Sequence, residues 1–293
     1  LLGDEKTFNS NFRHPIERQD DPQRRMLLNR RIKPFLVRRT KDSVAKELPP
    51  KTEMVRKVEL SGAQRDLYET VRLAMDQKVR EEIDRKGVAR SQIVILEALL
   101  KLRQVCCDPR LVKSTKKAAA TGSAKLIDLM QMIEDLLEEK RKILVFSQFT
   151  SMLELIEEEL EARDIPYALL TGETRDRGAQ VAAFQQGAVP IFLISLKAGG
   201  VGLNLTAADT VIHYDPWWNP AAENQATDRA WRIGQDKPVF VYKLIAKGTL
   251  EEKIQLLQQK KSDLAQSVLA DGESQKLALT QEDLQQIFAP LQD

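Results

Sequence analysis

Five short apolar runs, separated by longer amphipathic stretches, constrain the fold of this chain more than any other feature. Each run is continuous rather than alternating, which is typical of parallel strands that are buried on both faces. The stretches between them repeat apolar residues at helical spacing, so helices are expected on both sides of the sheet. The sequence therefore predicts an α/β fold with strands at 142–147, 167–170, 191–194, 210–214 and 239–245.

Helical patterns flank this region on both sides. Ser61 is a candidate cap for a first helix, Gly87 ends that helix, and the apolar positions Leu99 and Leu102 belong to a second helix before Asp108. Together they predict a helical hairpin over 61–113. The motif that starts at Thr249 is read as a capping box opening a long helix, and Thr280 starts a last short helix. Before the hairpin the chain is irregular, with a short helix at 21–32 and a strand at 54–60.

Composition excludes several classes of protein. The 293 residues are 42% hydrophobic and 30% charged, and no apolar run has the roughly 20 residues of a membrane helix. No signal peptide is recognisable, and the chain starts without Met, so it is expected to be a fragment of a longer protein. The two cysteines, Cys106 and Cys107, are adjacent and are interpreted as reduced thiols of an intracellular protein, cytoplasmic or nuclear. No metal-ligand spacing is present.

Charge is uneven along the chain although the net charge is only +2. The segment from Arg13 to Lys41 contains ten lysines and arginines but three acidic residues. The segment from Glu134 to Glu161 contains nine acidic residues but three basic ones. Local basicity of the first kind fits contact with phosphates. A solvated helix face is the alternative, and charge alone favours it.

Small polar residues follow the predicted strands. Ser147, Thr171, Gly172, Lys197 and Asp215 each come just after the end of a strand. The carboxyl ends of parallel strands share one edge of the sheet, which is where ligands bind in such folds. Hydroxyls, backbone N–H groups and a lysine at this edge suit phosphate oxygens. The alternative is that these residues only cap helices and close turns.

The glycines at 199–202 do not form a known phosphate-binding motif by themselves. No Gly-Lys-Ser/Thr follows them or occurs elsewhere in the chain, so a Walker A loop is absent. The spacing also differs from the dinucleotide fingerprint.

A polar helix is predicted to begin after Asn219 and to carry Gln225, Arg229 and Arg232 on one face. Two guanidinium groups on one face repel each other unless an anion lies between or opposite them. A transferring γ-phosphoryl group is such an anion. The alternative is a surface pair between Asp228 and Arg232, worth less than about 1 kcal/mol.

These blocks resemble the second RecA-like lobe of the Swi/Snf family, the DNA-translocating ATPases of helicase superfamily two. The resemblance rests on the Pro-Phe-Leu-Val-Arg-Arg-Thr-Lys segment, the Phe-Ser-Gln block of motif IV, motif V, a Trp-Asn-Pro block and motif VI. The corresponding ranges are 34–51, 143–149, 195–204, 218–220 and 225–235.

The resemblance implies a role for each candidate residue. Arg229 and Arg232 would be arginine fingers, Gln225 would lie in the same cleft, and Gly202 and Asn204 would couple the nucleotide state to DNA. The residues implied to contact double-stranded DNA are Ser147, Thr171, Gly172, Lys197 and Trp218. Trp218 has the alternative of being a core residue. The sequence Thr171-Gly172-Glu173-Thr174 departs from the family's commoner Asp-Gly-Ser-Thr, which puts the DNA contacts of this loop in question.

The resemblance also implies an organisation and a set of partners. The expected parts are an inter-lobe connecting segment (1–60), a helical protrusion and linker (61–122), a RecA-like lobe (123–248) and a C-terminal helical brace (249–293). ATP and Mg²⁺ would be held mainly by a first lobe that this chain lacks, so the chain alone is expected to be inactive. DNA, the first lobe and a DNA-bound protein complex are the candidate partners. The competing reading is a non-enzymatic nucleic-acid-binding or regulatory module; a small-molecule α/β enzyme would need an acid–base or nucleophile set that the sequence does not offer.

Overall fold

The computed structural model describes residues 2–19, 21–35, 48–60, 62–112, 122–200, 202–216, 220–268 and 280–291. The chain divides into two compact units, Leu1–Glu47 and Leu48–Asp293, and each is described by itself. No helix in the described ranges is long and apolar enough to cross a membrane.

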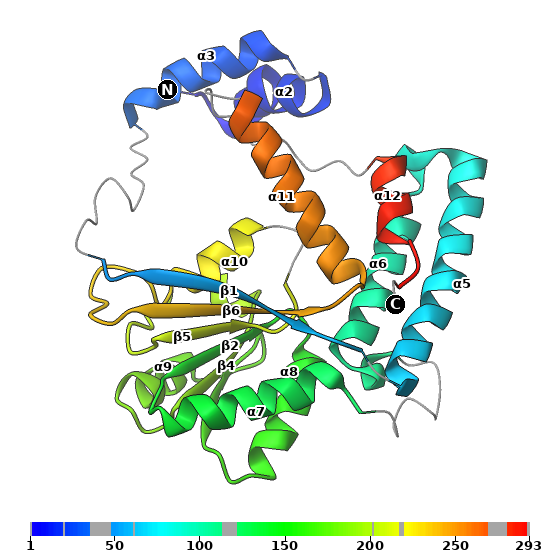
Figure 1. The fold of residues 1–293 in the computed structure, drawn as a ribbon. Coiled ribbons are helices and arrows are strands. Elements are labelled where there is room, and N and C mark those ends of the chain that lie inside the picture. Colours follow the sequence, from blue (N-terminus) through cyan, green and yellow to red (C-terminus); the bar gives the residue numbers. More distant parts are fainter. Residues whose placement is uncertain are drawn as a thin grey trace. The chain divides into compact units, whose positions relative to one another are not determined.

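Most of the described residues of the first unit are helical (Figure 1). Asp4 caps the first helix by accepting a hydrogen bond from the backbone N–H of Thr7 at 2.7 Å. Phe12 is buried, and the Arg31 guanidinium lies 5.7 Å from the centre of its ring. The helix expected at 21–32 is confirmed, but residues 5–19 are helical rather than irregular. The elements are α1 (Glu5–Phe8), the π-helical turn η1 (Asn9–Arg13), α2 (His14–Gln19), α3 (Pro22–Ile32) and the 3₁₀ turn η2 (Lys33–Phe35).

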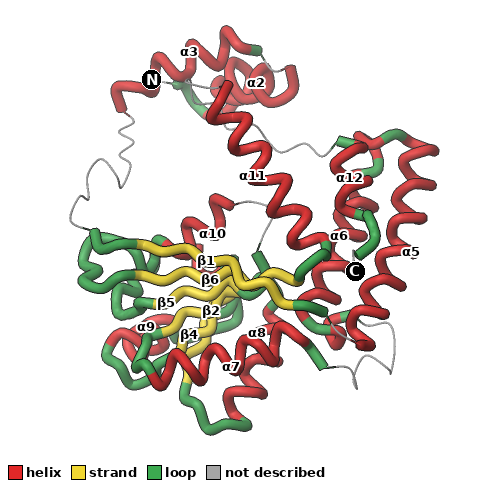
Figure 2. The backbone as a smooth tube through the Cα atoms, in the orientation of Figure 1, coloured by secondary structure: helices red, strands yellow, loops and turns green. Residues whose placement is uncertain are grey.

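The second unit is built on a six-stranded sheet in the order β1-β6-β5-β2-β4-β3, with every neighbouring pair parallel. Figure 2 shows these strands as one continuous yellow layer between red helices. The parallel α/β fold and all five apolar strands expected from the sequence are confirmed. The strands are β1 (Lys51–Val58), β2 (Ile143–Ser147), β3 (Tyr167–Leu170), β4 (Ile191–Ser195), β5 (Thr210–His213) and β6 (Val239–Ala246).

Strand β1 differs from the expectation in both its bounds and its place. It begins at Lys51 rather than Met54, and it pairs with β6 from Lys51 opposite Val239 to Val58 opposite Ala246. The connecting segment, in which a strand was expected at 54–60, therefore supplies an edge strand of the same sheet. Most of its side chains are exposed or half-buried because β1 lies at the edge, so its sequence lacks the continuous apolar pattern of the central strands.

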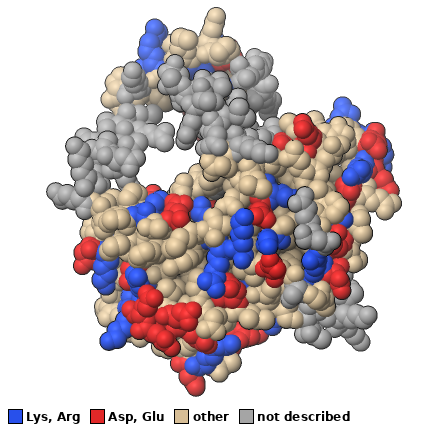
Figure 3. All heavy atoms as spheres, in the orientation of Figure 1, with Lys and Arg blue, Asp and Glu red and all other residues tan. Residues whose placement is uncertain are grey.

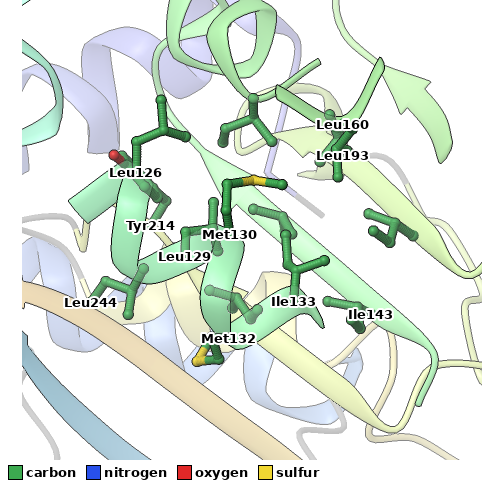
Figure 4. Close-up of a cluster of buried hydrophobic side chains, with 14 of the residues drawn as sticks. Leu126, Leu129, Met130, Met132, Ile133, Ile143, Leu160, Leu193, Tyr214 and Leu244 are labelled. Carbon is green, nitrogen blue, oxygen red and sulfur yellow. The ribbon is translucent and has the colours of Figure 1, made fainter. Parts of the chain in front are cut away.

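Helices cover both faces of the sheet. On one face α7 (Ala124–Glu138) and α8 (Thr150–Glu161) pack on strand residues such as Ile143 and Leu193; the cluster contains the side chains labelled in Figure 4. On the other face α9 (Arg177–Gln185) and α10 (Pro220–Thr227) contribute Phe184 and Ala226 to a second cluster. The Ser123 hydroxyl caps α7, as expected, by accepting from the backbone N–H of Leu126.

A third cluster joins the predicted hairpin to the C-terminal helices. Tyr68, Leu102, Leu250 and Ile287 are fully buried in it, and the Tyr68 hydroxyl accepts from the backbone N–H of Leu250 at 2.8 Å. The hairpin and both later helices are confirmed. The elements are α5 (Gly62–Lys86), α6 (Gln92–Cys107), α11 (Leu250–Val268) and α12 (Gln281–Ile287), with 3₁₀ turns η3 (Val88–Arg90), η4 (Pro109–Leu111) and η6 (Ala198–Gly200).

The capping box expected at Thr249 is wrong in its pairing. The Thr249 hydroxyl accepts from the N–H of Glu251 and donates to the carbonyl of Ala246, while the Glu252 carboxylate accepts from Gly248. The neighbouring Glu251 carboxylate accepts from the N–H of Ala246 at 2.8 Å. A true capping box occurs instead at Thr280, at the start of α12.

Candidate functional site

The carboxyl ends of β2, β4 and β5 are joined by hydrogen bonds between their following turns. Ser147 lies opposite Ser195 in the sheet, and the N–H of Leu196 donates to the Ser147 carbonyl at 2.8 Å. After β5, the Asp215 carboxylate accepts from the N–H of Gln148 at 3.2 Å. These bonds hold the turns that follow the strands at one edge of the sheet, as parallel pairing requires.

A buried arginine of the hairpin binds the residues that follow β2 and β5. Arg103 on α6 donates to the Asp215 carboxylate at 3.1 Å, to the Asp215 carbonyl at 3.2 Å and to the Gln148 side-chain oxygen at 3.3 Å. Both charged side chains are almost completely buried, with exposed fractions of 4% and 0%. The guanidinium also lies 5.4 Å from the ring centre of Phe149. The ends of two strands are thus fixed to a helix that is distant in the sequence.

Burial raises the pKa of Asp215 to about 6, and the Arg103 guanidinium acts in the opposite direction by favouring the carboxylate. The neighbouring His213 is also fully buried, and burial lowers its pKa to about 3. Its Nε2 lies 2.9 Å from the Thr227 hydroxyl of α10. His213 is therefore neutral at physiological pH and joins β5 to α10.

The predicted DNA-contacting residues differ in their exposure. Lys197 and Gly172 are exposed, and a Cβ placed on Gly172 would meet no atom within 4 Å. Thr171 is half-buried, and its hydroxyl accepts from the N–H of Glu173. Ser147 is buried, and its hydroxyl accepts from the N–H of Phe149 at 3.1 Å, so its side chain braces the turn. Trp218 lies outside the described residues.

The two candidate arginines both reach the glycine-containing loop that follows β4. Arg229 Nε donates to the Gly199 carbonyl at 3.1 Å, and Arg232 Nη1 donates to the Leu203 carbonyl at 3.0 Å. The N–H of Leu205 in turn donates to the Arg229 carbonyl at 2.9 Å. Both arginine side chains belong to half-buried residues. The structure therefore brings Arg229 and Arg232 together on one loop, and this loop also contains Gly202 and Asn204.

The expected helical face that carries Gln225, Arg229 and Arg232 is wrong, because α10 ends at Thr227. Beyond that residue the N–H groups of Arg229 and Ala230 bond to carbonyls three residues earlier, which tightens the chain into turns. Only Gln225 is helical. It is exposed, as are Gly202 and Asn204.

The acidic stretch expected between Glu134 and Glu161 lies on α7 and α8. Glu134, Glu138, Glu154 and Glu158 are all exposed, while the apolar residues of these helices point to the sheet. Figure 3 shows acidic side chains gathered in the lower part of the face in view. The acidic run is therefore an outer helix face.

Sequence reasoning did not anticipate the burial of several charged residues, among them Arg103, Lys125 and Glu251. Arg103 joins the strand ends, and Lys125 of α7 pairs with Glu251 of α11 at 3.0 Å, with both side chains at most 2% exposed. A signal was present, because Arg103 follows Leu99 by four residues and Lys125 precedes Leu129 by four. A charged residue in line with the apolar stripe of a helix faces the core and needs a buried partner.

Comparisons with known proteins agree with this architecture. The sequence matches the family model of the SNF2-related domain over residues 1–111 and that of the helicase conserved C-terminal domain over residues 124–234. It is 38% identical to the putative ATP-dependent helicase/translocase YwqA of Bacillus subtilis, over 98% of this chain and 31% of that protein. The chain spans only 27–31% of the length of this and two further curated relatives.

Two solved structures from Sulfolobus solfataricus are similar in fold and in sequence. The SWI2/SNF2 ATPase C-terminal domain matches with a TM-score of 0.63 and 34% identity, over 81% of this chain and 97% of that one. The SWI2/SNF2 ATPase core in complex with double-stranded DNA matches with a TM-score of 0.65 and 34% identity, over 98% of this chain and 60% of that one.

Proposed function

Because this chain belongs to the SNF2 family of ATPases, whose C-terminal RecA-like lobe it matches, we propose that it is the second motor lobe of an ATP-dependent translocase on double-stranded DNA. It would supply arginine fingers and contacts to the DNA backbone. A first lobe of the same polypeptide would hold ATP and Mg²⁺, since the chain has no Walker A sequence.

The observation that carries the proposal is the convergence of Arg229 and Arg232 on one loop. Arg229 donates to the Gly199 carbonyl at 3.1 Å and Arg232 to the Leu203 carbonyl at 3.0 Å, and a guanidinium is a planar fork of N–H donors. Two such groups that reach the same loop favour an anion with several oxygens. A γ-phosphoryl group presented by the first lobe is the anion we assign to them, with Gln225 in the same cleft.

The polar strand ends are the part we assign to DNA. Lys197 is exposed there, and Gly172 leaves open space where a side chain would stand, which allows a phosphate to approach the backbone closely. Thr171, Ser147 and Trp218 complete the proposed set, with Ser147 acting through the turn that its hydroxyl braces. Gly202 and Asn204 lie in the loop after β4, which the two arginines contact and which follows one of the strand ends assigned to DNA. These two residues are therefore suited to couple the nucleotide state to DNA. A DNA-bound protein complex is the proposed object of the motor.

The test is DNA-stimulated ATP hydrolysis by the full-length protein. Arg232→Ala should lower turnover by about 10³-fold or more, the range of arginine fingers, while DNA affinity stays unchanged. Arg163→Ala is the matched control, because Arg163 is bonded to Glu134 and Glu159 on the acidic face. Equal turnover in the wild type and Arg232→Ala would refute the finger assignment.

Activity of the isolated chain tests the division of labour. Residues 1–293 alone should not hydrolyse ATP, and addition of the separately produced first lobe should restore some DNA-stimulated activity. Clear DNA-stimulated ATPase activity of the isolated chain would contradict the proposal. Strong, salt-sensitive DNA binding that gains nothing from the first lobe would favour a non-enzymatic DNA-binding module instead.

A further inference from the structure

One tryptophan joins the turn that carries the two arginines to the start of edge strand β1. Trp231 Nε1 donates to the Pro49 carbonyl at 2.8 Å, two residues before β1 begins. The ammonium group of Lys51, the first residue of β1, lies 5.1 Å from the centre of the Trp231 ring. The indole therefore holds the entry of β1 by a hydrogen bond and by a cation–π contact.

The position of Trp231 in the chain makes this contact relevant to the arginines. Trp231 stands directly before Arg232 and two residues after Arg229, in a segment whose N–H groups bond back to Ala226 and Thr227. Such a turn has little freedom between neighbouring residues. A displacement of the indole is therefore passed to the guanidinium groups on either side.

A second attachment runs from β1 to the helix before the arginines. Lys51 pairs with Glu53 at 2.6 Å, Lys243 of β6 lies 3.6 Å from Glu53, and the same lysine pairs with Glu223 of α10 at 3.1 Å. Glu53 is 40% exposed, so water screens this chain of charges and it adds little stability. These contacts matter for geometry rather than for stability. They connect the start of β1 to both ends of segment 223–231, at Glu223 and at Trp231.

Pro49 and Pro50, the two residues before β1, form a stiff segment, so a displacement of the preceding chain is passed on to β1 and Trp231. Pro49 and Pro50 have their φ angles fixed by their rings. Both carbonyls are engaged, since Pro49 accepts from Trp231 and Pro50 accepts from the N–H of Val239 at 3.0 Å. A movement of the chain that enters β1 cannot be absorbed at these residues without breaking a hydrogen bond.

We propose that Trp231 is a positioning residue that ties the location of Arg229 and Arg232 to the segment entering β1. That segment is part of residues 1–60, which we assign to the connection between the two lobes, so we expect ATP turnover to depend on the position of the first lobe. The inference rests on the proposed function, because it needs the arginines to act on ATP.

The test uses the full-length protein and Trp231→Phe, which keeps an aromatic ring next to Lys51 and removes the N–H donor. We expect kcat of ATP hydrolysis to fall about fivefold, the factor that one lost hydrogen bond supplies, with KM for ATP and DNA affinity unchanged. Tyr167→Phe is the matched control, since it removes one ring-borne donor, to Glu161, at the opposite edge of the sheet. It should leave kcat unchanged.

A combined variant separates positioning from a merely structural role. If Trp231 acts through the two arginines, Trp231→Phe should cause no further loss of turnover in an Arg229→Ala/Arg232→Ala background, measured with enough enzyme to detect residual hydrolysis. The same fivefold loss in both backgrounds would overturn the inference. If Trp231→Phe does not fold, Lys51→Met, which removes the cation–π contact with Trp231 and the pair with Glu53, carries the test, and unchanged kcat there would overturn it.

The two ideas fail in different ways. Unchanged turnover of Arg232→Ala contradicts the proposed function itself. A large loss in Arg232→Ala combined with unchanged kcat in Trp231→Phe contradicts only the positioning role and leaves the proposed function intact.

Discussion

Replacing Glu251 by Gln removes one charge from a fully buried ion pair. Lys125 Nζ lies 3.1 and 3.0 Å from the two carboxylate oxygens of Glu251 and 4.9 Å from the centre of the Tyr214 ring. Burial is the largest influence and acts to lower the pKa of Lys125, but the Glu251 carboxylate and the other nearby acidic groups, among them Asp215, together outweigh it, so this pKa is raised above its ordinary value. The ammonium group is therefore charged in the wild type and would be left in the core without its counter-charge.

The expected loss is large because the partner charge remains buried. Breaking a buried pair by removing one member costs about 3–5 kcal/mol. A domain is stable by only about 5–15 kcal/mol, so Glu251→Gln should remove a large fraction of the unfolding free energy. The Glu251 oxygen that accepts from the N–H of Ala246 is replaced by an amide that can keep this bond, which confines the change mainly to the charge.

The assay is urea unfolding of the chain at neutral pH, with the double variant Lys125→Met/Glu251→Gln as the decisive comparison. With both charges gone, no unpaired ion is buried, so the double variant should recover most of the loss. Lys78→Met is the matched control, because its partner Glu97 lies on the outside of the hairpin and the pair is 45% and 42% exposed. Its unfolding midpoint should hardly move.

The pH dependence of Glu251→Gln gives a second check on the same reasoning. Without the carboxylate, burial dominates and the pKa of Lys125 falls below its unfolded value of 10.5. The unfolded chain then binds a proton that the folded chain releases, so the deficit should shrink as the pH rises toward 10. A deficit that is independent of pH, or a double variant as unstable as Glu251→Gln, would refute the argument.

Two further variants test the interior and the proposed DNA edge. The pKa of His213 is lowered from 6.5 to about 3 by burial, so below pH 6.5 the unfolded chain takes up a proton that the folded chain refuses. His213 should therefore lower the free energy of unfolding by about 1.4 kcal/mol per pH unit as the pH drops from 6.5 to 4.5. In urea unfolding of His213→Asn, the free energy should lack this contribution to its pH dependence. Equal slopes would contradict the burial argument. Gly172→Val should leave the unfolding midpoint unchanged, since a Cβ there meets no atom within 4 Å, and should weaken DNA binding by the full-length protein; unchanged affinity would remove Gly172 from the proposed DNA contacts.

The central strands could be predicted because their burial leaves a direct trace in the sequence. Strands β2, β4 and β5 are buried at every residue, so each reads as a continuous apolar run. Strand β1 carries no such trace, because an edge strand packs on one neighbour only and tolerates polar side chains. Its place in the sheet is set by its pairing with β6, which is a long-range contact that local patterns do not encode.

The candidate arginines were identified correctly as neighbours, but for the wrong geometric reason. Spacing of three and four residues suggested one helical face, whereas α10 ends at Thr227 and turns carry Arg229 and Arg232. What brings them together is the loop after β4, whose carbonyls at Gly199 and Leu203 accept from the two side chains. Helix propensity does not report such a tertiary bond, so the end of the helix was not predictable from spacing.

The helical hairpin is more than an appendage to the sheet, because one of its buried arginines, Arg103, closes the polar network at the strand ends. Arg103 and Asp215 are both hidden from water, and a buried charge without its partner costs several kcal/mol. The turn after β5 can therefore keep its position only while α6 keeps Arg103 in place. The hairpin and the edge of the sheet must consequently order together, and any ligand that moves the turn after β5 has to act against the packing of α6.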